Sequence, residues 1–217
     1  MESIDKAKNV IDYYVLCAKL KNIIRSGWKN WNVSRNRLES VAEHVYGTGH
    51  LAIAMWSEYK YDLDIAKVMM MLTVHELEEI IIGDLTEWDA TKEEKSKHGY
   101  EAIKLILGNL LQKEQIKQLI VEFEEQKTKE AIFAFQCDKL ECDIQSKLYD
   151  EEGCVDLTKQ ENNPAFNDPY IQELLKNKGS WSGMWLEFSR NKFPYDINFT
   201  EVSNYVENNN IGTNNLK

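Results

Sequence analysis

The chain has 217 residues, of which 43% are hydrophobic, and a formal net charge of −10; this length suits one domain with its own core. The charge excludes a nucleic-acid polymer as partner, because phosphate backbones are bound by clustered Lys and Arg and no such stripe occurs here. No apolar run reaches the roughly 18 residues that cross a bilayer, and the N-terminus lacks the layout of a signal peptide, so we expect a cytoplasmic protein without a membrane partner.

Helical periodicity runs through most of the sequence. Apolar residues recur at three- and four-residue intervals, and the three prolines all fall in the last quarter of the chain. This pattern predicts an all-α fold, a single-domain helical bundle over residues 1–207.

The first half of the chain is predicted to form three helices. The first is expected over residues 4–24, and a loop rich in Trp, Asn and Arg follows over residues 26–37. The residues expected on the apolar face of the first helix are Val10, Tyr14, Cys17 and Leu20. A second helix is expected over residues 38–59. The residues expected on its buried face are Val41, Val45, Thr48, Ala52 and Met55.

The third predicted helix spans residues 64–83. Residues 66–74 are apolar nearly all round, which predicts a buried central helix from which His75 and Glu76 emerge. Gly83 is expected to end it, because glycine most readily closes a helix in the left-handed conformation.

Local signals also mark helices in the second half. Thr91 and Glu94 form a Ser/Thr-x-x-Glu capping box, and Asp168 followed by Pro169 has the form of another helix start. Helices are therefore expected over residues 91–111, 115–125 and 128–149, and after Pro169. The Asn-rich residues 208–217 are expected to form a flexible C-terminal tail.

The four cysteines show no Cys-x-x-Cys spacing. Cys137 and Cys142 fall in an amphipathic helical segment, where cysteine behaves as a small hydrophobic residue. We therefore expect reduced, structural thiols.

Potential metal ligands are concentrated at the end of the third helix. Residues 75–84 carry one imidazole and four carboxylates in an otherwise apolar stretch, a set that is costly to bury without a cation. His44 and Asp138 lie in helical contexts elsewhere. Together with His75 and Glu76 they predict a divalent ion held between helices. A mixture of imidazole and carboxylate suits Mn, Fe, Co, Ni or Zn better than Mg alone.

Spacing on a continuous helix assigns these residues to faces. Glu79 lies four residues from His75 and three from Glu76, so its side chain shares a face with theirs, while His75 and Glu76 diverge by about 100°. Glu78 lies about 200° round the helix from Glu76, and we expect it to point away from the site.

Five short motifs, in order, resemble the HD-domain superfamily of metal-dependent phosphohydrolases, most closely its 5′-deoxynucleotidase branch. Residues 39–44 read Glu-Ser-Val-Ala-Glu-His, beside Glu-Ser-Val-(Ser/Ala)-(Glu/Asp)-His in that branch. Residues 75–84 read His-Glu-Leu-Glu-Glu-Ile-Ile-Ile-Gly-Asp, beside His-Asp-x-x-Glu-x-x-x-Gly-Asp. Residues 138–141 (Asp-Lys-Leu-Glu) match the branch's helix carrying Asp. Residues 25–28 (Arg-Ser-Gly-Trp) and 166–169 (Phe-Asn-Asp-Pro) resemble its Arg-Thr-Gly-Trp and Phe-Asn-His-Pro.

The resemblance implies a helical HD-domain enzyme that releases phosphate from (deoxy)nucleoside 5′-monophosphates as a 5′-nucleotidase. It implies one divalent ion (Mn, Co, Ni, Zn, Fe or Mg), with the ligands His44, His75, Glu76 and Asp138. Glu79 would act as general acid or base, or orient the attacking water. The implied substrate contacts are Arg25 to the phosphate, Asp84 to the sugar hydroxyl, and Trp28.

Several interpretations stay open. The chain has Glu76 where the branch has the Asp that names the superfamily, so metal affinity or preference is expected to differ, and a non-catalytic nucleotide sensor is the alternative function. Trp28 is either a stacking platform for a nucleobase or a core aromatic residue. The zinc-peptidase motif His-Glu-x-x-His is incomplete, because Glu79 stands in place of its second His. A homodimer is also implied, with residues 181–193 as a candidate interface.

Overall fold

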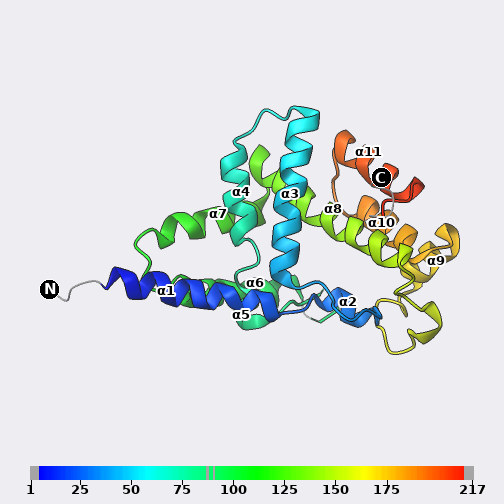
Figure 1. Cartoon of the computed structure of the whole chain (residues 1–217), viewed down its shortest axis with the longest axis horizontal. Coiled ribbons are helices and arrows are strands. Elements are labelled where there is room, and N and C mark those ends of the chain that lie inside the picture. The colour runs from blue at the N-terminus through cyan, green and yellow to red at the C-terminus, as the bar shows by residue number, and fades with distance from the viewer. Residues whose placement is uncertain (1–4, 87, 90, 213–217) are drawn as a thin grey trace.

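The computed structural model describes residues 5–86, 88–89 and 91–212, and the regular elements of this described chain are all helices (Figure 1). The all-α prediction is confirmed. The α-helices are α1 (Lys6–Cys17), α2 (Ser26–Asn30), α3 (Val41–Tyr59), α4 (Ile65–Val74), α5 (Glu79–Ile82), α6 (Lys92–Leu107), α7 (Lys113–Glu125), α8 (Lys129–Glu151), α9 (Pro169–Lys178), α10 (Trp181–Lys192) and α11 (Ile197–Asn208). Two 3₁₀ helices span Ala18–Asn22 and Leu157–Lys159.

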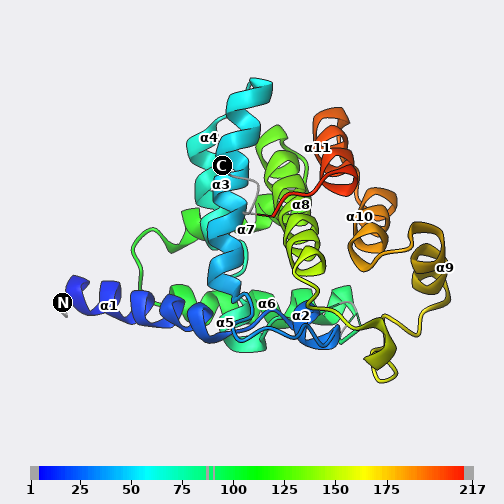
Figure 2. The ribbon, with the colours of Figure 1, turned by 45° about the vertical axis from the view of Figure 1, so that its right-hand side comes forward.

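Three helices form the centre of the molecule. α3, α4 and α8 stand side by side and pack against one another, while α1, α5 and α6 lie across their lower ends (Figures 1 and 2). α10 and α11 pack on α8 from the other side, and α9 packs on α10. The fully buried core residues shared by the three central helices include Ala52, Val68, Met71, Ala134 and Leu140. α8 therefore lies between the two halves of the fold.

Side-chain caps fix where several helices begin. The Ser40 side chain accepts from the backbone N–H of Glu43, and the Glu43 side chain accepts from that of Ser40, so α3 starts three residues later than predicted. The predicted Thr91–Glu94 box starts α6 in the same way. Asp168 caps α9, with Pro169 as the first helical residue, as predicted. Each cap satisfies N–H groups that a helix start leaves unpaired.

The predicted third helix is interrupted, which is the main departure from the sequence-based prediction. α4 ends at Val74, residues 75–78 form turns, and α5 then runs to Ile82 before Gly83, which has a φ of 78°. In the interruption and just after it, the N–H groups of Leu77 and Ile80 donate to carbonyls three residues back rather than four. Angles counted along a continuous helix therefore do not hold for residues 75–79, and the outward direction predicted for Glu78 is wrong.

The N-terminal helix is shorter than predicted, and only part of its predicted apolar face is buried. α1 ends at Cys17 and continues as the 3₁₀ helix. Val10 and Tyr14 are 58% and 60% exposed, so their predicted burial is wrong, whereas Cys17 and Leu20 pack on the core as predicted, together with Tyr13. Tyr13 precedes Leu20 by about two turns, which places both on the inner face.

Two other segments also differ from prediction. Residues 26–37, predicted as a loop, contain α2. α6 ends at Leu107 instead of residue 111, because Gly108 adopts a φ of 47° and closes the helix.

Residues 213–217, half of the predicted tail, lie outside the described residues. The preceding residues are attached to the fold, since the N–H groups of Ile211 and Gly212 donate to the carboxylate of Glu151 at 3.0 and 2.7 Å. All four cysteines lie in the described chain and are free. None of the described helices combines the length and the apolarity that a membrane span requires.

A buried carboxyl between α8 and α10 makes stability depend on pH. Asp143 is fully buried and accepts from the hydroxyls of Ser189 at 2.6 Å and Tyr195 at 2.9 Å. Burial raises its pKa from 3.8 to about 7 against these hydrogen bonds. Below pH 3.8 both folded and unfolded chains are protonated here, and as the pH rises towards 7 only the unfolded chain ionises, so stability is lost.

We expect Asp143→Asn to remove this loss, because an amide keeps the acceptor for Ser189 but cannot ionise. The variant should gain on the order of a few kcal/mol in unfolding free energy relative to wild type between acid and neutral pH. Urea denaturation of both proteins across that range measures the difference. Two curves that run parallel would contradict the assignment.

Candidate metal centre

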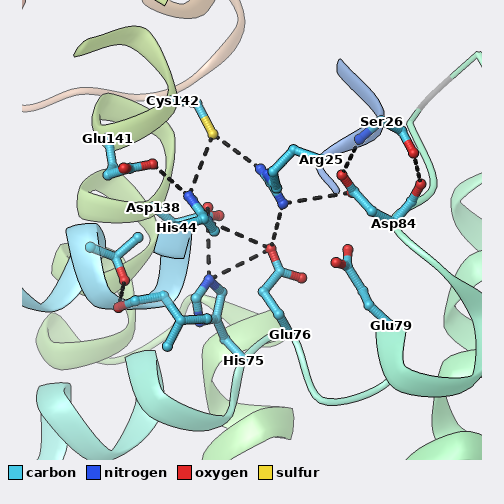
Figure 3. A network of polar contacts seen from close by, with 12 residues as sticks. Arg25, Ser26, His44, His75, Glu76, Glu79, Asp84, Asp138, Glu141 and Cys142 are labelled. Carbon is cyan, nitrogen blue, oxygen red and sulfur yellow. Dashed lines mark hydrogen bonds and ion pairs between the residues drawn. The ribbon is translucent and has the colours of Figure 1, made fainter. Parts of the chain in front are cut away.

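Four side chains from three separate segments meet where the central helices cross (Figure 3). His44 comes from α3, His75 and Glu76 from the turn after α4, and Asp138 from α8. One N or O atom of each lies within 4.8 Å of those of the others, and all four residues are buried. The structure thus brings together the four residues that the sequence selects as ligands.

One ring nitrogen of His75 is hydrogen-bonded, and the other has no hydrogen-bond partner among the described residues. Its Nδ1 lies 2.8 Å from the carbonyl oxygen of Leu72, which can only accept, so Nδ1 carries the proton. Nε2 is buried and has no hydrogen-bond partner among the described residues. It faces Oε1 of Glu76 at 3.7 Å and Oδ1 of Asp138 at 3.8 Å. A buried lone pair facing two carboxylates is suited to a cation.

The two carboxylates of the cluster are held ionised. Burial opposes ionisation of Glu76, but the positive charges of Arg25 and Lys95 favour it, and the pKa of this carboxyl is held below its usual range. Burial likewise opposes ionisation of Asp138, whose pKa is nevertheless held well below its usual range, first of all by Lys139. The Nζ of Lys139 lies 2.8 Å from Oδ2 of Asp138 and leaves Oδ1 to the histidines. Two anionic oxygens beside two imidazoles fit a divalent cation.

The imidazole of His44 is fully buried and contacts a carboxylate on each side. Nε2 lies 3.0 Å from Oδ1 of Asp138, and Nδ1 lies 2.5 Å from Oε2 of Glu141. With an ion on Nε2, the Nδ1–H would donate to Glu141, an arrangement that orients metal-binding histidines in many proteins. Glu141 was not among the predicted site residues, although its position three residues after Asp138 on one helix was a signal for it.

Glu79, the predicted acid or base, lies beside the cluster at the start of α5 (Figure 3). It is fully buried, its Oε1 lies 3.4 Å from Nζ of Lys95, and its Oε2 has no hydrogen-bond partner among the described residues. Burial raises the pKa of this carboxyl, and the carboxylates of Glu76 and Asp84 raise it further. Lys95 reaches the site from α6, and no sequence pattern pointed to it.

Arg25 and Asp84 lie on the far side of Glu76 from the histidines (Figure 3). The Nη1 of Arg25 lies 3.3 Å from Oε1 of Glu76 and 3.6 Å from Oδ1 of Asp84, and its Nη2 lies 3.1 Å from Sγ of Cys142. The other oxygen of Asp84 accepts from the backbone N–H of Ser26 at 2.6 Å. These contacts hold the guanidinium and the carboxylate at the edge of the cluster.

Trp28 packs in the core beside the site. It is 1% exposed, and its indole N–H donates to Oε2 of Glu39 at 2.7 Å. Its ring lies 5.1 Å from that of Trp185 and 5.3 Å from that of Tyr149, measured between centroids. These contacts favour the interpretation of Trp28 as a core aromatic residue, and it also lines a cavity.

A cavity of about 620 Å³ opens in front of the cluster. Its lining includes the charged residues Arg25, Glu76 and Asp138 and the aromatic residues Trp185, Phe188 and Phe193. Glu78 also lines this cavity and is 9% exposed, so the prediction that it points away from the site is wrong. The turn at residues 75–78 redirects it, and Gly99 leaves room, since a Cβ there would lie 3.3 Å from Cγ of Glu78.

Comparison with known proteins adds to this geometry. The sequence model of the HD domain matches residues 17–168. A 5′-deoxynucleotidase of Dictyostelium discoideum is 33% identical over 153 residues, which cover 66% of this chain and 79% of that protein. A 5′-deoxynucleotidase of Danio rerio is 33% identical over 179 residues, 78% of this chain and 86% of that protein. The fold is similar to that of a Pyrococcus horikoshii protein, with a TM-score of 0.61 and 22% identity over 91% of this chain and 98% of that one.

Proposed function

Because the chain belongs to the HD-domain family, we propose that it is a divalent-metal-dependent phosphomonoesterase, a 5′-nucleotidase acting on (deoxy)nucleoside 5′-monophosphates. The observation that carries the proposal is the unpartnered Nε2 of His75, which faces Glu76 and Asp138 at 3.7 and 3.8 Å. A divalent ion held by these three residues and His44 would supply Lewis acidity at the phosphate and activate water.

The side chains around the metal centre would bind the substrate and transfer the proton. Arg25 binds the phosphate through charge-assisted hydrogen bonds. The carboxyl of Glu79 donates a proton to the departing sugar oxygen, or receives one from the attacking water, at its unpartnered Oε2. Asp84 accepts a hydrogen bond from a sugar hydroxyl. Trp28 supports the wall of the cavity rather than stacking on a base.

The cavity supports a mononucleotide as substrate. A volume of about 620 Å³ falls within the roughly 300–1,000 Å³ of small-molecule sites. Its charged lining residues suit a phosphate, and the aromatic side chains of Trp185 and Phe188 suit a nucleobase. A substrate that joins a phosphate to an aromatic ring fits both kinds of lining residue.

The cellular compartment and the oligomeric state also remain proposals. We propose that the protein is cytoplasmic, which is supported by its four free cysteines.

We also propose that the protein forms a homodimer. Residues 181–193 are the interface predicted from the sequence, but Trp181 and Met184 of this stretch are buried within the chain itself and are not available to a partner. The apolar side chains of Ile11 and Val15 on α1 are 57% and 55% exposed and are available. Light scattering measures the mass in solution, and a monomer would exclude the dimer.

Phosphate release from a panel of nucleoside and deoxynucleoside 5′-monophosphates tests the proposed function. Each substrate is offered with Mn, Co, Ni, Zn or Mg. We expect release that requires the ion and stops on chelation, and the panel identifies the preferred sugar and base. A folded protein that binds metal and nucleotide yet releases no phosphate with any ion would be a nucleotide sensor.

A further inference from the structure

An interior glycine of α3 faces the carboxylate that contacts His44. Gly47 lies three residues after His44, and Glu141 lies three residues after Asp138 on α8, which packs against α3. Each pair therefore shares one face of its helix. Gly47 has an ordinary helical backbone, not the positive φ of Gly83, and glycine is less favourable than alanine inside a helix. Its presence is explained by its neighbour, not by its own conformation.

The carboxylate of Glu141 occupies the space that a side chain at residue 47 would need. A Cβ on Gly47 would lie under 3.0 Å from Oε1 of Glu141, with Cδ and Cγ of the same side chain next, at 3.0 and 3.1 Å. The carboxylate has little freedom to retreat, because Glu141 is 9% exposed and its Oε2 lies 2.5 Å from Nδ1 of His44. An alanine at residue 47 would therefore displace the carboxylate from His44.

The contact with Glu141 decides which nitrogen of His44 is available to an ion. The ring is fully buried, so no bulk water replaces a lost acceptor for the Nδ1–H. With Nδ1–H donated to Glu141, Nε2 presents its lone pair towards Asp138 and Glu76, from which it lies 3.0 and 3.7 Å. Without Glu141, the contact left at Nδ1 among the described residues is the more distant Sγ of Cys142, at 3.9 Å, so the ring is held less firmly in this orientation and tautomer. Partners of this kind contribute about 10- to 100-fold to metal affinity.

We propose that Glu141 is a positioning residue of the metal centre and that residue 47 is glycine because the Glu141 carboxylate must pass there to reach His44. This rests on the metal site of the proposed function. Neither residue touches substrate. Their effect is on how tightly, and in which ring orientation, His44 holds the ion.

Metal affinity of the full chain tests the proposal directly. Purified protein is stripped of metal, and the dissociation constant for Co²⁺ or Mn²⁺ is measured by calorimetry for wild type, Gly47→Ala, Glu141→Ala, Glu141→Gln and the double variant Gly47→Ala/Glu141→Ala. Gly49→Ala is the matched control, because it makes the same substitution in the same helix. A Cβ there would meet only Met69 within 4 Å, at the flexible end of its side chain, 3.0 Å away.

We expect Gly47→Ala and Glu141→Ala each to weaken metal binding about 10- to 100-fold. Glu141→Gln should lose less than Glu141→Ala, since its amide oxygen still accepts from His44, and Gly49→Ala should bind as wild type. In the Glu141→Ala background, Gly47→Ala should add less than about a twofold change, because the displaced carboxylate is already absent.

The double variant separates a positioning role from general packing. If Gly47→Ala alone fails to fold while the double variant folds and binds like Glu141→Ala, the clash with Glu141 is established. Wild-type affinity in Gly47→Ala, or losses that multiply in the double variant, would overturn the inference and leave the proposed function intact. A wild-type protein that binds no ion would overturn both.

Discussion

Replacing Asp138 by alanine is expected to abolish metal-dependent phosphate release, with a loss on the order of a thousandfold or more. Asp138 lies at the centre of the cluster and is 3% exposed. Its Oδ1 lies 3.0 Å from Nε2 of His44 and 3.8 Å from Nε2 of His75, so its removal takes away the oxygen that both imidazoles face. The ion would lose a ligand and part of the negative charge that holds it.

Two measurements separate this loss from a loss of folding. Circular dichroism should show the helical content of wild type, and calorimetry should show weakened binding of Mn²⁺ or Co²⁺. Asp150→Asn is a suitable control, because Asp150 lies on the same helix and accepts from Ser182 away from the site. Wild-type phosphate release by Asp138→Ala would remove this residue from the centre.

Glu79→Gln is expected to lower kcat by about a hundredfold to ten-thousandfold while leaving metal affinity near that of wild type. The amide has the shape of the carboxyl but can neither donate nor receive the transferred proton. Glu79 lies beside the cluster, and its ion-pair partner is Lys95, 3.4 Å away, so the metal-binding residues keep their contacts. Steady-state kinetics with the preferred nucleotide, together with calorimetry of metal binding, distinguishes the two effects.

Glu78→Gln is the matched control for that experiment. Glu78 is the preceding residue, lines the same cavity, and also has a buried Oε2 without a hydrogen-bond partner among the described residues. If burial and charge alone were responsible, both substitutions would lower kcat alike. Only a specific proton-transfer role predicts a large effect for Glu79 and a small one for Glu78.

The parts of the fold that sequence predicted well depend on local chemistry. The Thr91–Glu94 box and the Asp168–Pro169 start were found where the structure has them, because a cap involves residues only a few positions apart. The buried residues Thr48, Ala52 and Met55 followed from helical spacing in the same way.

The interruption after α4 was not predictable from the pattern. Residues 66–74 are apolar nearly all round, so their pattern shows no single buried face whose loss would mark the end of α4. The change from i−4 to i−3 hydrogen bonds that follows has no signature in the residue types. The error carried over to Glu78, which was assigned to the outside by counting degrees along a helix that is not continuous there.

Other features of the site depend on how distant helices approach one another. Lys95 contacts Glu79 only because α6 packs on α5, and Glu141 reaches His44 only because α3 and α8 lie in contact. Spacing within one helix can predict which residues share a face, but not which residue of another helix lies opposite. The role of Gly47 is invisible without that pairing.

The candidate ligands come from stretches that are distant in the sequence, with His44 and Asp138 separated by 94 residues. An ion held by them is a reversible cross-link between α3, the turn after α4, and α8, and it has no equivalent partner in the unfolded chain. By mass action, an ion at one hundred times its dissociation constant adds about 2.7 kcal/mol to the free energy of unfolding. Scarcity of the ion would therefore deplete the folded protein itself, in addition to silencing its chemistry.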